Sequence, residues 1–223
     1  MSSRLRAFDT SVGTKILIGL SGLALILYLL AHIVGNLLIF FGPEVYNRYA
    51  HTLTGNPLIL PIEIGLALVF LIHIYKTIRM SVASRKARPA AYVVKRYAGP
   101  PSRKSLASST MIISGLWLLV FLVIHVRAFR FGLHYTTPEG VRDLYAVEME
   151  ILRSPLTVAF YVLTMGLVGA HLWHGFSSAF QSLGIDDARW TPRLLVLSKT
   201  TAVLIAGGFI VITLWVHLTG GVP

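Results

Sequence analysis

The stretch PLTVAFYVLTMGLVGAHLWHGFSSAF, from Pro155 to Phe180, contains no Asp, Glu, Lys or Arg and places two histidines in a largely apolar run. A helix rises about 1.5 Å per residue, so about 20 residues cross a hydrocarbon layer of about 30 Å. This segment is therefore long enough and apolar enough to span a membrane as a helix.

Four more segments of the same character lie on either side of it, at roughly residues 15–41, 57–80, 108–131 and 194–218. Together with the segment just described, at roughly 155–180, they make five. Only 13% of the 223 residues are charged, and 55% are hydrophobic. Barrel strands would alternate apolar and polar residues, and these segments do not. We therefore predict an all-α integral membrane protein, with residues 1–223 forming a single membrane domain of five transmembrane helices. The first segment is too long for a signal-peptide core and is expected to be retained.

Lysine and arginine are distributed unequally between the two ends of the predicted spans. Fifteen lie in the N-terminal tail and in the connections at 76–104 and 189–199, whereas five lie on the opposite side. The positive-inside rule then places the N-terminus in the cytoplasm and the C-terminus outside. This topology and anionic lipid headgroups account for the net charge of +11, so we expect no nucleic-acid partner. The 76–104 connection either follows the lipid surface or docks a cytoplasmic partner.

The chain has no cysteine and eight histidines. The absence of cysteine excludes disulfides, thiolate-held iron–sulfur clusters and the covalent attachment of c-type haem. A cofactor would therefore need other ligands, and histidine is the obvious source.

Four spans contain one histidine each in their apolar part, and helix rise pairs them by depth. His32 and His125 lie about 24 and 21 Å from the cytoplasmic edge, whereas His73 and His171 lie about 22 and 24 Å from the outer edge. We call the first two the outer pair and the second two the inner pair; the pairs are separated by about 16 Å in depth. Two imidazoles at one level are the axial ligands that a low-spin haem iron needs. We therefore predict a four-helix haem-binding bundle plus one additional helix, with two haem b irons bound by these pairs.

Other uses of intramembrane histidine remain open. Each histidine alone could form an interhelical hydrogen bond. A zinc site would need ligands close together, and only His171 and His174 approach that, without a third ligand. A haem-free transporter or proton channel that uses these histidines and Glu63 is the main alternative function.

Glycines near the histidines suggest where a macrocycle could fit. Gly22 and Gly115 each precede an outer histidine by ten residues, and Gly166 and Gly169 precede His171. We expect the first two to make room beside the outer pair and the last two beside the inner pair. Plain helix–helix contact is the alternative role for each.

Several segments together resemble a known family: SGLALILYLLAHIVGNLLIFFGPEVYNRYA (21–50), NPLILPIEIGLALVFLIHIYKTIRM (56–80), RKARPAAY (85–92) and GAHLWHGFSSAFQSLG (169–184). They are similar to the cytochrome b558 subunit of succinate dehydrogenase or fumarate reductase. The motifs AHIVGN, IHIYK and AHLWHG carry the similarity, which covers nearly the whole chain and is least clear at 131–153.

The resemblance implies a five-helix, dihaem membrane anchor with the ligand pairs given above. It implies partners on the cytoplasmic face, an FAD-containing flavoprotein and an iron–sulfur subunit, and a multi-pass location in the bacterial inner (cytoplasmic) membrane. It implies electron exchange with quinone, with menaquinone as the expected species, during succinate oxidation or fumarate reduction. The chain itself has no nucleotide fingerprint and no soluble domain for a dicarboxylate site, so we assign it no catalytic residue. A purely structural anchor whose haems have no kinetic role is a further alternative.

The resemblance also bears on the surroundings of His171. The family's ligand lies four residues before a glycine, which fits His171 and Gly175 and leaves His174 as a neighbour. Some relatives carry a glutamate where Gly169 stands, so we expect no proton path built on that glutamate here. Candidate quinone or haem-propionate contacts are His174, Glu63, His51, Ser21 and Arg79, together with Tyr46, Asn56 and Lys76.

Overall fold

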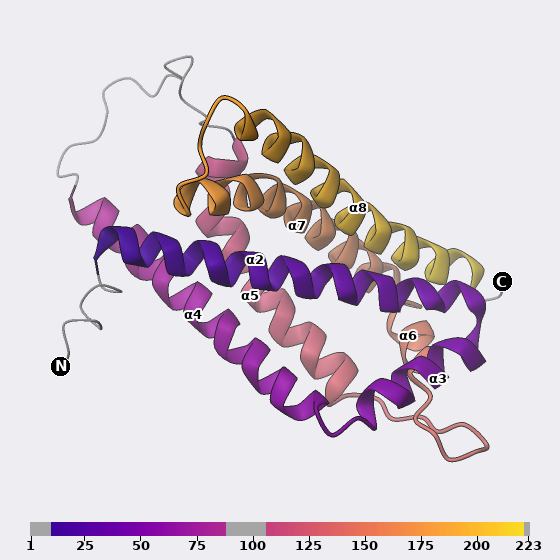
Figure 1. Ribbon diagram of the computed structural model, residues 1–223. Helices are drawn as coiled ribbons and strands as arrows, with labels where there is room; N and C mark the ends of the chain where they lie inside the picture. Colours follow the sequence, from indigo (N-terminus) through magenta and orange to yellow (C-terminus); the bar gives the residue numbers. More distant parts are fainter. Residues whose placement is uncertain (1–9, 88–105, 221–223) are drawn as a thin grey trace.

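The computed structural model describes residues 10–87 and 106–220, and most of these residues are helical (Figure 1). Five helices are long and apolar enough to cross a membrane, which confirms the predicted all-α, five-span architecture. They are α2 (Ser11–Asn36, continued by the short 3₁₀ helix η1, Leu37–Phe41), α4 (Ile59–Lys86), α5 (Leu106–Arg130), α7 (Pro155–Ser182) and α8 (Trp190–Thr219). The basic residues expected at 4–6 and 88–104 lie outside the described residues.

Local chemistry explains where these helices begin and end. Thr10 precedes α2, and its hydroxyl accepts a hydrogen bond from the backbone N–H of Gly13 at 3.0 Å. Pro155 opens α7, where a missing N–H costs nothing. Gly220 ends α8 with φ of +62°, a left-handed conformation that favours glycine.

The helices pack unevenly. The closest pair is α7 and α8, and Gly169 of α7 lets them approach, because a Cβ there would lie 3.1 Å from the Cβ of Ala206. Helix α2 packs against α4 and α7, and α5 packs against α7. Helix α4 contributes no buried residue, so most of its apolar surface is left to face lipid.

Two short helices cover one end of the bundle, which we call the outer end (Figure 1). Helix α3 (Pro43–Thr54) follows Gly42, whose φ is +88°, and helix α6 (Leu144–Ile151) follows Asp143. The two helices are joined by Asn47: its Nδ2 donates to Asp143 Oδ1 at 2.8 Å, and its Oδ1 accepts from the backbone N–H of Tyr145 at 2.9 Å. This helical cap was not predicted, because its two helices are short and lie in segments that read as loops between spans.

Candidate functional site

Each inner histidine is held by a serine from a neighbouring helix. Ser21 Oγ on α2 lies 3.1 Å from His73 Nδ1 on α4, and Ser114 Oγ on α5 lies 3.0 Å from His171 Nδ1 on α7. Both serines are buried. The same contact is therefore made twice, once between each pair of helices.

The partners of the serines indicate which nitrogen of each inner histidine carries the proton. Ser21 Oγ also donates to Leu17 O at 2.6 Å, and Ser114 Oγ donates to Met111 O at 3.1 Å. A hydroxyl has a single proton, so once it is given to the carbonyl the oxygen can only accept from the imidazole. We therefore assign the proton of each inner histidine to Nδ1. That tautomer leaves the Nε2 lone pair free to bind a metal.

Glycines lie beside the inner imidazoles, not the outer ones. A Cβ at Gly22 would lie 3.3 Å from His73 Cε1, and a Cβ at Gly115 would lie 3.5 Å from His171 Cε1. The expectation that these glycines make room for the outer pair was wrong. Ten residues of helix span about 15 Å, so each glycine lies at a different depth from the outer histidine of its own helix.

The two glycines on α7 differ from each other. Gly169 makes the contact with Ala206 described above, which is the helix–helix role and not the expected one. A Cβ at Gly166 would meet no atom within 4 Å, so the expectation that Gly166 makes room beside the inner pair stays a prediction. The glycines that lie directly beside the inner imidazoles come from α2 and α5, the neighbouring helices.

The outer histidines lie against each other. The ring centroids of His32 and His125 are 6.0 Å apart, with the rings nearly perpendicular at 87°. Rings in T-shaped contact have centroids about 4.5–7 Å apart, so this is the spacing of two packed rings. Their Nδ1 atoms are each 3.4 Å from a polar group, Asn36 Nδ2 and Tyr161 OH respectively. Such contacts are long for hydrogen bonds, so they do not fix the tautomers of the outer pair.

Aromatic rings surround the outer pair. Tyr28 stacks on His32 at 5.4 Å between centroids, and Phe209 lies 5.5 Å from the same ring. Phe121 and Phe129 lie 5.4 and 4.9 Å from His125. These rings pack apolar surface around both imidazoles of the outer pair.

The remaining candidate residues are spread over both ends of the bundle. Ser21 is occupied by His73, and His174 is half-buried within electrostatic range of His171. Glu63 on α4 forms an ion pair with Arg130 on α5 at 3.3 Å. The side chains of His51 on α3 and Arg79 on α4 are exposed. The structure therefore does not gather these residues into one quinone pocket.

Two polar residues near the inner pair were missed in the sequence. Ser114 was detectable, because SGLALILYLLAH (21–32) and SGLWLLVFLVIH (114–125) share a Ser-Gly pair eleven residues before the outer histidine. Thr77, one turn from His73 on α4, has a buried Oγ1 without a hydrogen-bond partner among the described residues. Nothing in the sequence distinguishes Thr77 from other threonines in spans.

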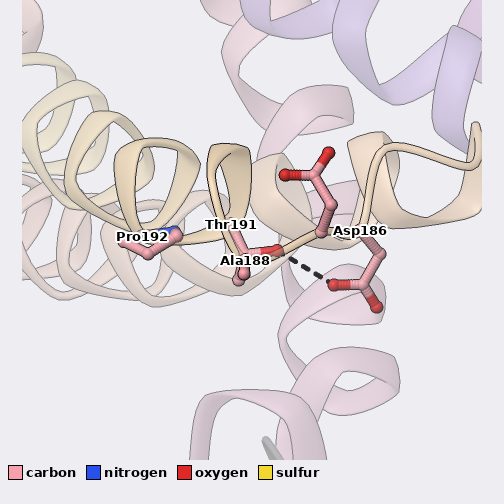
Figure 2. Close-up of a pocket in the computed structure, with 5 residues that line it drawn as sticks. Asp186, Ala188, Thr191 and Pro192 are labelled. Carbon is pink, nitrogen blue, oxygen red and sulfur yellow. Dashed lines mark hydrogen bonds between the residues drawn. The ribbon is translucent and has the colours of Figure 1, made fainter.

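A surface hollow between α7 and α8 contains none of the candidate residues. It is lined by two aspartates and by Ala188, Thr191 and Pro192 (Figure 2). Thr191 Oγ1 donates to Asp186 Oδ1 at 3.0 Å, and Asp187 Oδ1 accepts from two backbone N–H groups at the start of α8. These aspartates therefore shape the start of α8.

Within residues 10–87 and 106–220, no three or more His, Asp or Glu side chains come together in a way that could hold a metal ion. Comparison of this chain with protein-family models, with curated protein sequences and with solved structures gave no match. The proposals below therefore rest on the geometry of the histidines and on the sequence resemblance.

Proposed function

We propose that this chain is the dihaem cytochrome b membrane-anchor subunit of a succinate:quinone oxidoreductase, which exchanges electrons between an iron–sulfur subunit and membrane quinone. The observation that carries the haem part is the repeated serine–histidine contact. With the proton assigned to Nδ1, the contacts of Ser21 and Ser114 leave the Nε2 atom of each inner imidazole free to bind a metal. The sequence resemblance supports the choice of oxidoreductase.

The residues present fit haem b in two respects. The donors are imidazoles from different helices, and glycines stand beside both inner rings: a Cβ at Gly22 would lie only 3.3 Å from the His73 ring, and one at Gly115 would be in ordinary contact with the His171 ring at 3.5 Å. Haem b, when bound, supplies one-electron redox chemistry. The iron ligands would be His73 and His171 at the inner level and His32 and His125 at the outer level.

The surrounding residues orient the ligands and keep them dry. A serine that accepts from Nδ1–H fixes the ring and makes the opposite nitrogen more basic, which strengthens its bond to a metal. The aromatic rings around the outer pair lower the local dielectric constant. The orphaned hydroxyl of Thr77 is a candidate partner for a polar group of the inner cofactor.

The partners and the location follow from the resemblance. We propose that an FAD-containing flavoprotein and an iron–sulfur subunit dock at the cytoplasmic end, where α4 ends and α5 begins, in a bacterial inner membrane. His174 and Arg79 lie toward that end and would serve a quinone or a propionate there, whereas Glu63 and His51 would serve a quinone at the outer end.

A reduced-minus-oxidised optical spectrum of the purified chain, with a haem-to-protein ratio, tests the proposal. We expect a b-type spectrum and two haems per chain. Replacement His73→Ala should remove one haem and leave the other, whereas His134→Ala, at an exposed histidine outside the spans, should leave both. A protein without b-type haem would instead favour the transporter or proton-channel alternative.

A further inference from the structure

A carboxyl group is buried in the helical cap above the outer histidines. Glu148 on α6 is 5% exposed, and Tyr46 OH on α3 donates to its Oε2 at 2.7 Å. No Lys or Arg of the described residues forms an ion pair with Glu148. A buried carboxylate without a cation is costly, so this group holds a proton more readily than an exposed glutamate does.

Burial raises the pKa of Glu148 to about 7, and the hydrogen bond from Tyr46 partly opposes that shift. Burial also raises the pKa of Tyr46 well above its ordinary value, so Tyr46 stays protonated and remains the donor. Glu148 therefore changes charge near neutral pH, and Tyr46 does not.

The groups that interact with Glu148 come from α3, α6 and α7, whereas α5 and α8, which also pack on α6, contribute none among the described residues. Tyr46 and Tyr145 interact with it from α3 and α6, and Tyr161 interacts with it electrostatically from α7. On the remaining two helices, the titratable groups near this end are Arg127 and Arg130 in the last turn of α5, and His217 of α8, whose Nδ1 lies 2.9 Å from Leu152 O. The interactions of Glu148 are thus with tyrosines.

Polar groups lead from this carboxyl to both outer imidazoles. Tyr46 OH also lies 3.4 Å from Asn36 Oδ1, and Asn36 Nδ2 lies 3.4 Å from His32 Nδ1. Tyr161 OH lies 3.4 Å from His125 Nδ1. Glu148 is therefore linked to His32 through Tyr46 and Asn36, whereas Tyr161, beside His125, interacts with it only electrostatically.

We propose that Glu148 takes up a proton from the outer aqueous phase when the redox group held by the outer histidine pair gains an electron. The inference rests on the proposed function. An electron supplied by the proposed iron–sulfur subunit or by quinol would reduce the redox group held at the outer pair, one proton from the outer aqueous phase would convert the Glu148 carboxylate into a carboxylic acid, and both would leave on reoxidation. A negative charge added in a medium of low dielectric constant raises the proton affinity of a nearby carboxylate, which couples the two events.

The test is a redox titration of the purified holoprotein at a series of pH values, with the two haems assigned through the His73→Ala variant. In the wild type, the midpoint potential of the outer haem should fall by up to about 59 mV per pH unit, beginning near neutral pH. Glu148→Gln, which keeps the size and an acceptor for Tyr46, should flatten this dependence. Glu150 lies two residues further along α6, and its side chain is half-exposed. Glu150→Gln is therefore the matched control and should leave the pH dependence of the outer-haem potential unchanged.

Infrared difference spectra provide a readout that a purely structural role would not change. Reduction should produce the carbonyl band of a protonated carboxylic acid in the wild type and in Glu150→Gln, and not in Glu148→Gln. Tyr46→Phe removes the hydrogen bond that lowers the pKa of Glu148, so the fall in potential should begin at a higher pH. This variant tests the proposal even if Glu148→Gln does not fold.

The outcomes are separable. A protein without haem would refute the proposed function and this inference with it. A dihaem protein whose outer potential does not depend on pH, or depends on it equally in Glu148→Gln, would overturn the inference alone. The inference would also be overturned if, in Tyr46→Phe, the pH at which the outer-haem potential begins to fall stayed the same or moved to a lower value.

Discussion

The serine–histidine contact can be tested by Ser21→Ala. The substitution removes the acceptor of His73 Nδ1–H and leaves the backbone of α2 unchanged. The inner imidazole then loses its serine partner and keeps the backbone hydrogen bond with Ile18. We expect weaker binding of the inner haem and a change in its potential, while the outer haem is unaffected.

The size of the effect follows from the environment of the contact. Leaving a buried donor unpaired costs about 1–3 kcal/mol in soluble proteins, whereas hydrogen bonds between membrane helices average about 0.6 and reach about 1.7 kcal/mol. The membrane range is the appropriate one here, because Ser21 and His73 lie on two spans, α2 and α4. It corresponds to a loss of inner-haem affinity of roughly 3- to 20-fold.

The assay is transfer of haem from the purified protein to an excess of a competing haem-binding protein. The loss of the optical signal of the inner haem measures this transfer. Ser114→Ala should act on the same haem through His171 by a similar factor. Ser182→Ala is the control, because its hydroxyl donates to Ser178 O of its own helix at 2.9 Å and has no histidine partner.

Equal release of the inner haem from wild type, Ser21→Ala and Ser114→Ala, with an unchanged inner potential, would show that the serines do not hold the haem ligands. Release of the outer haem in place of the inner one would also contradict the assignment, since both serines contact inner histidines.

Two further predictions concern space and charge. Gly22→Val should lower the haem content from two towards one, because a Cβ there lies only 3.3 Å from an inner imidazole; Gly65→Val, where a Cβ meets no atom within 4 Å, should keep both haems. The pKa of Glu148 is raised from 4.5 to about 7 in the folded protein, so the folded state binds more protons than the unfolded state between these values. The free energy of unfolding should therefore decrease as pH rises through that window, by at most about 3 kcal/mol. Thermal unfolding in detergent at about pH 5 and about pH 8 should show this loss in the wild type and not in Glu148→Gln.

The five spans and the outer histidine pair show which features of this protein can be predicted from the sequence. Because a helix rises by a fixed length per residue, the height of a residue along its span follows from its number. This places His32 and His125 at one level, and their ring centroids lie 6.0 Å apart. The haem ligation of these residues, the membrane orientation and the partners remain predictions.

The rotation of each helix about its own axis, and the side chains of other helices that face it, cannot be derived from residue numbers. Gly22 was assigned to the wrong histidine, because a residue number gives height along its own helix and says nothing of which side chain on another helix faces it. The cap of α3 and α6 was missed for a related reason. Short helices gain their stability from tertiary packing, here through Asn47 and the buried Val147, more than from their own sequence.

The number of spans, their apolar character and the height of each histidine along its span can be read from the chain, because they depend on composition and on a constant rise per residue. The contacts of the serines of α2 and α5 with the inner imidazoles, and the burial of Glu148 above the outer pair, became visible in the folded structure alone. Those contacts depend on how the helices rotate and pack against one another, and that arrangement is set by side chains far apart in the chain.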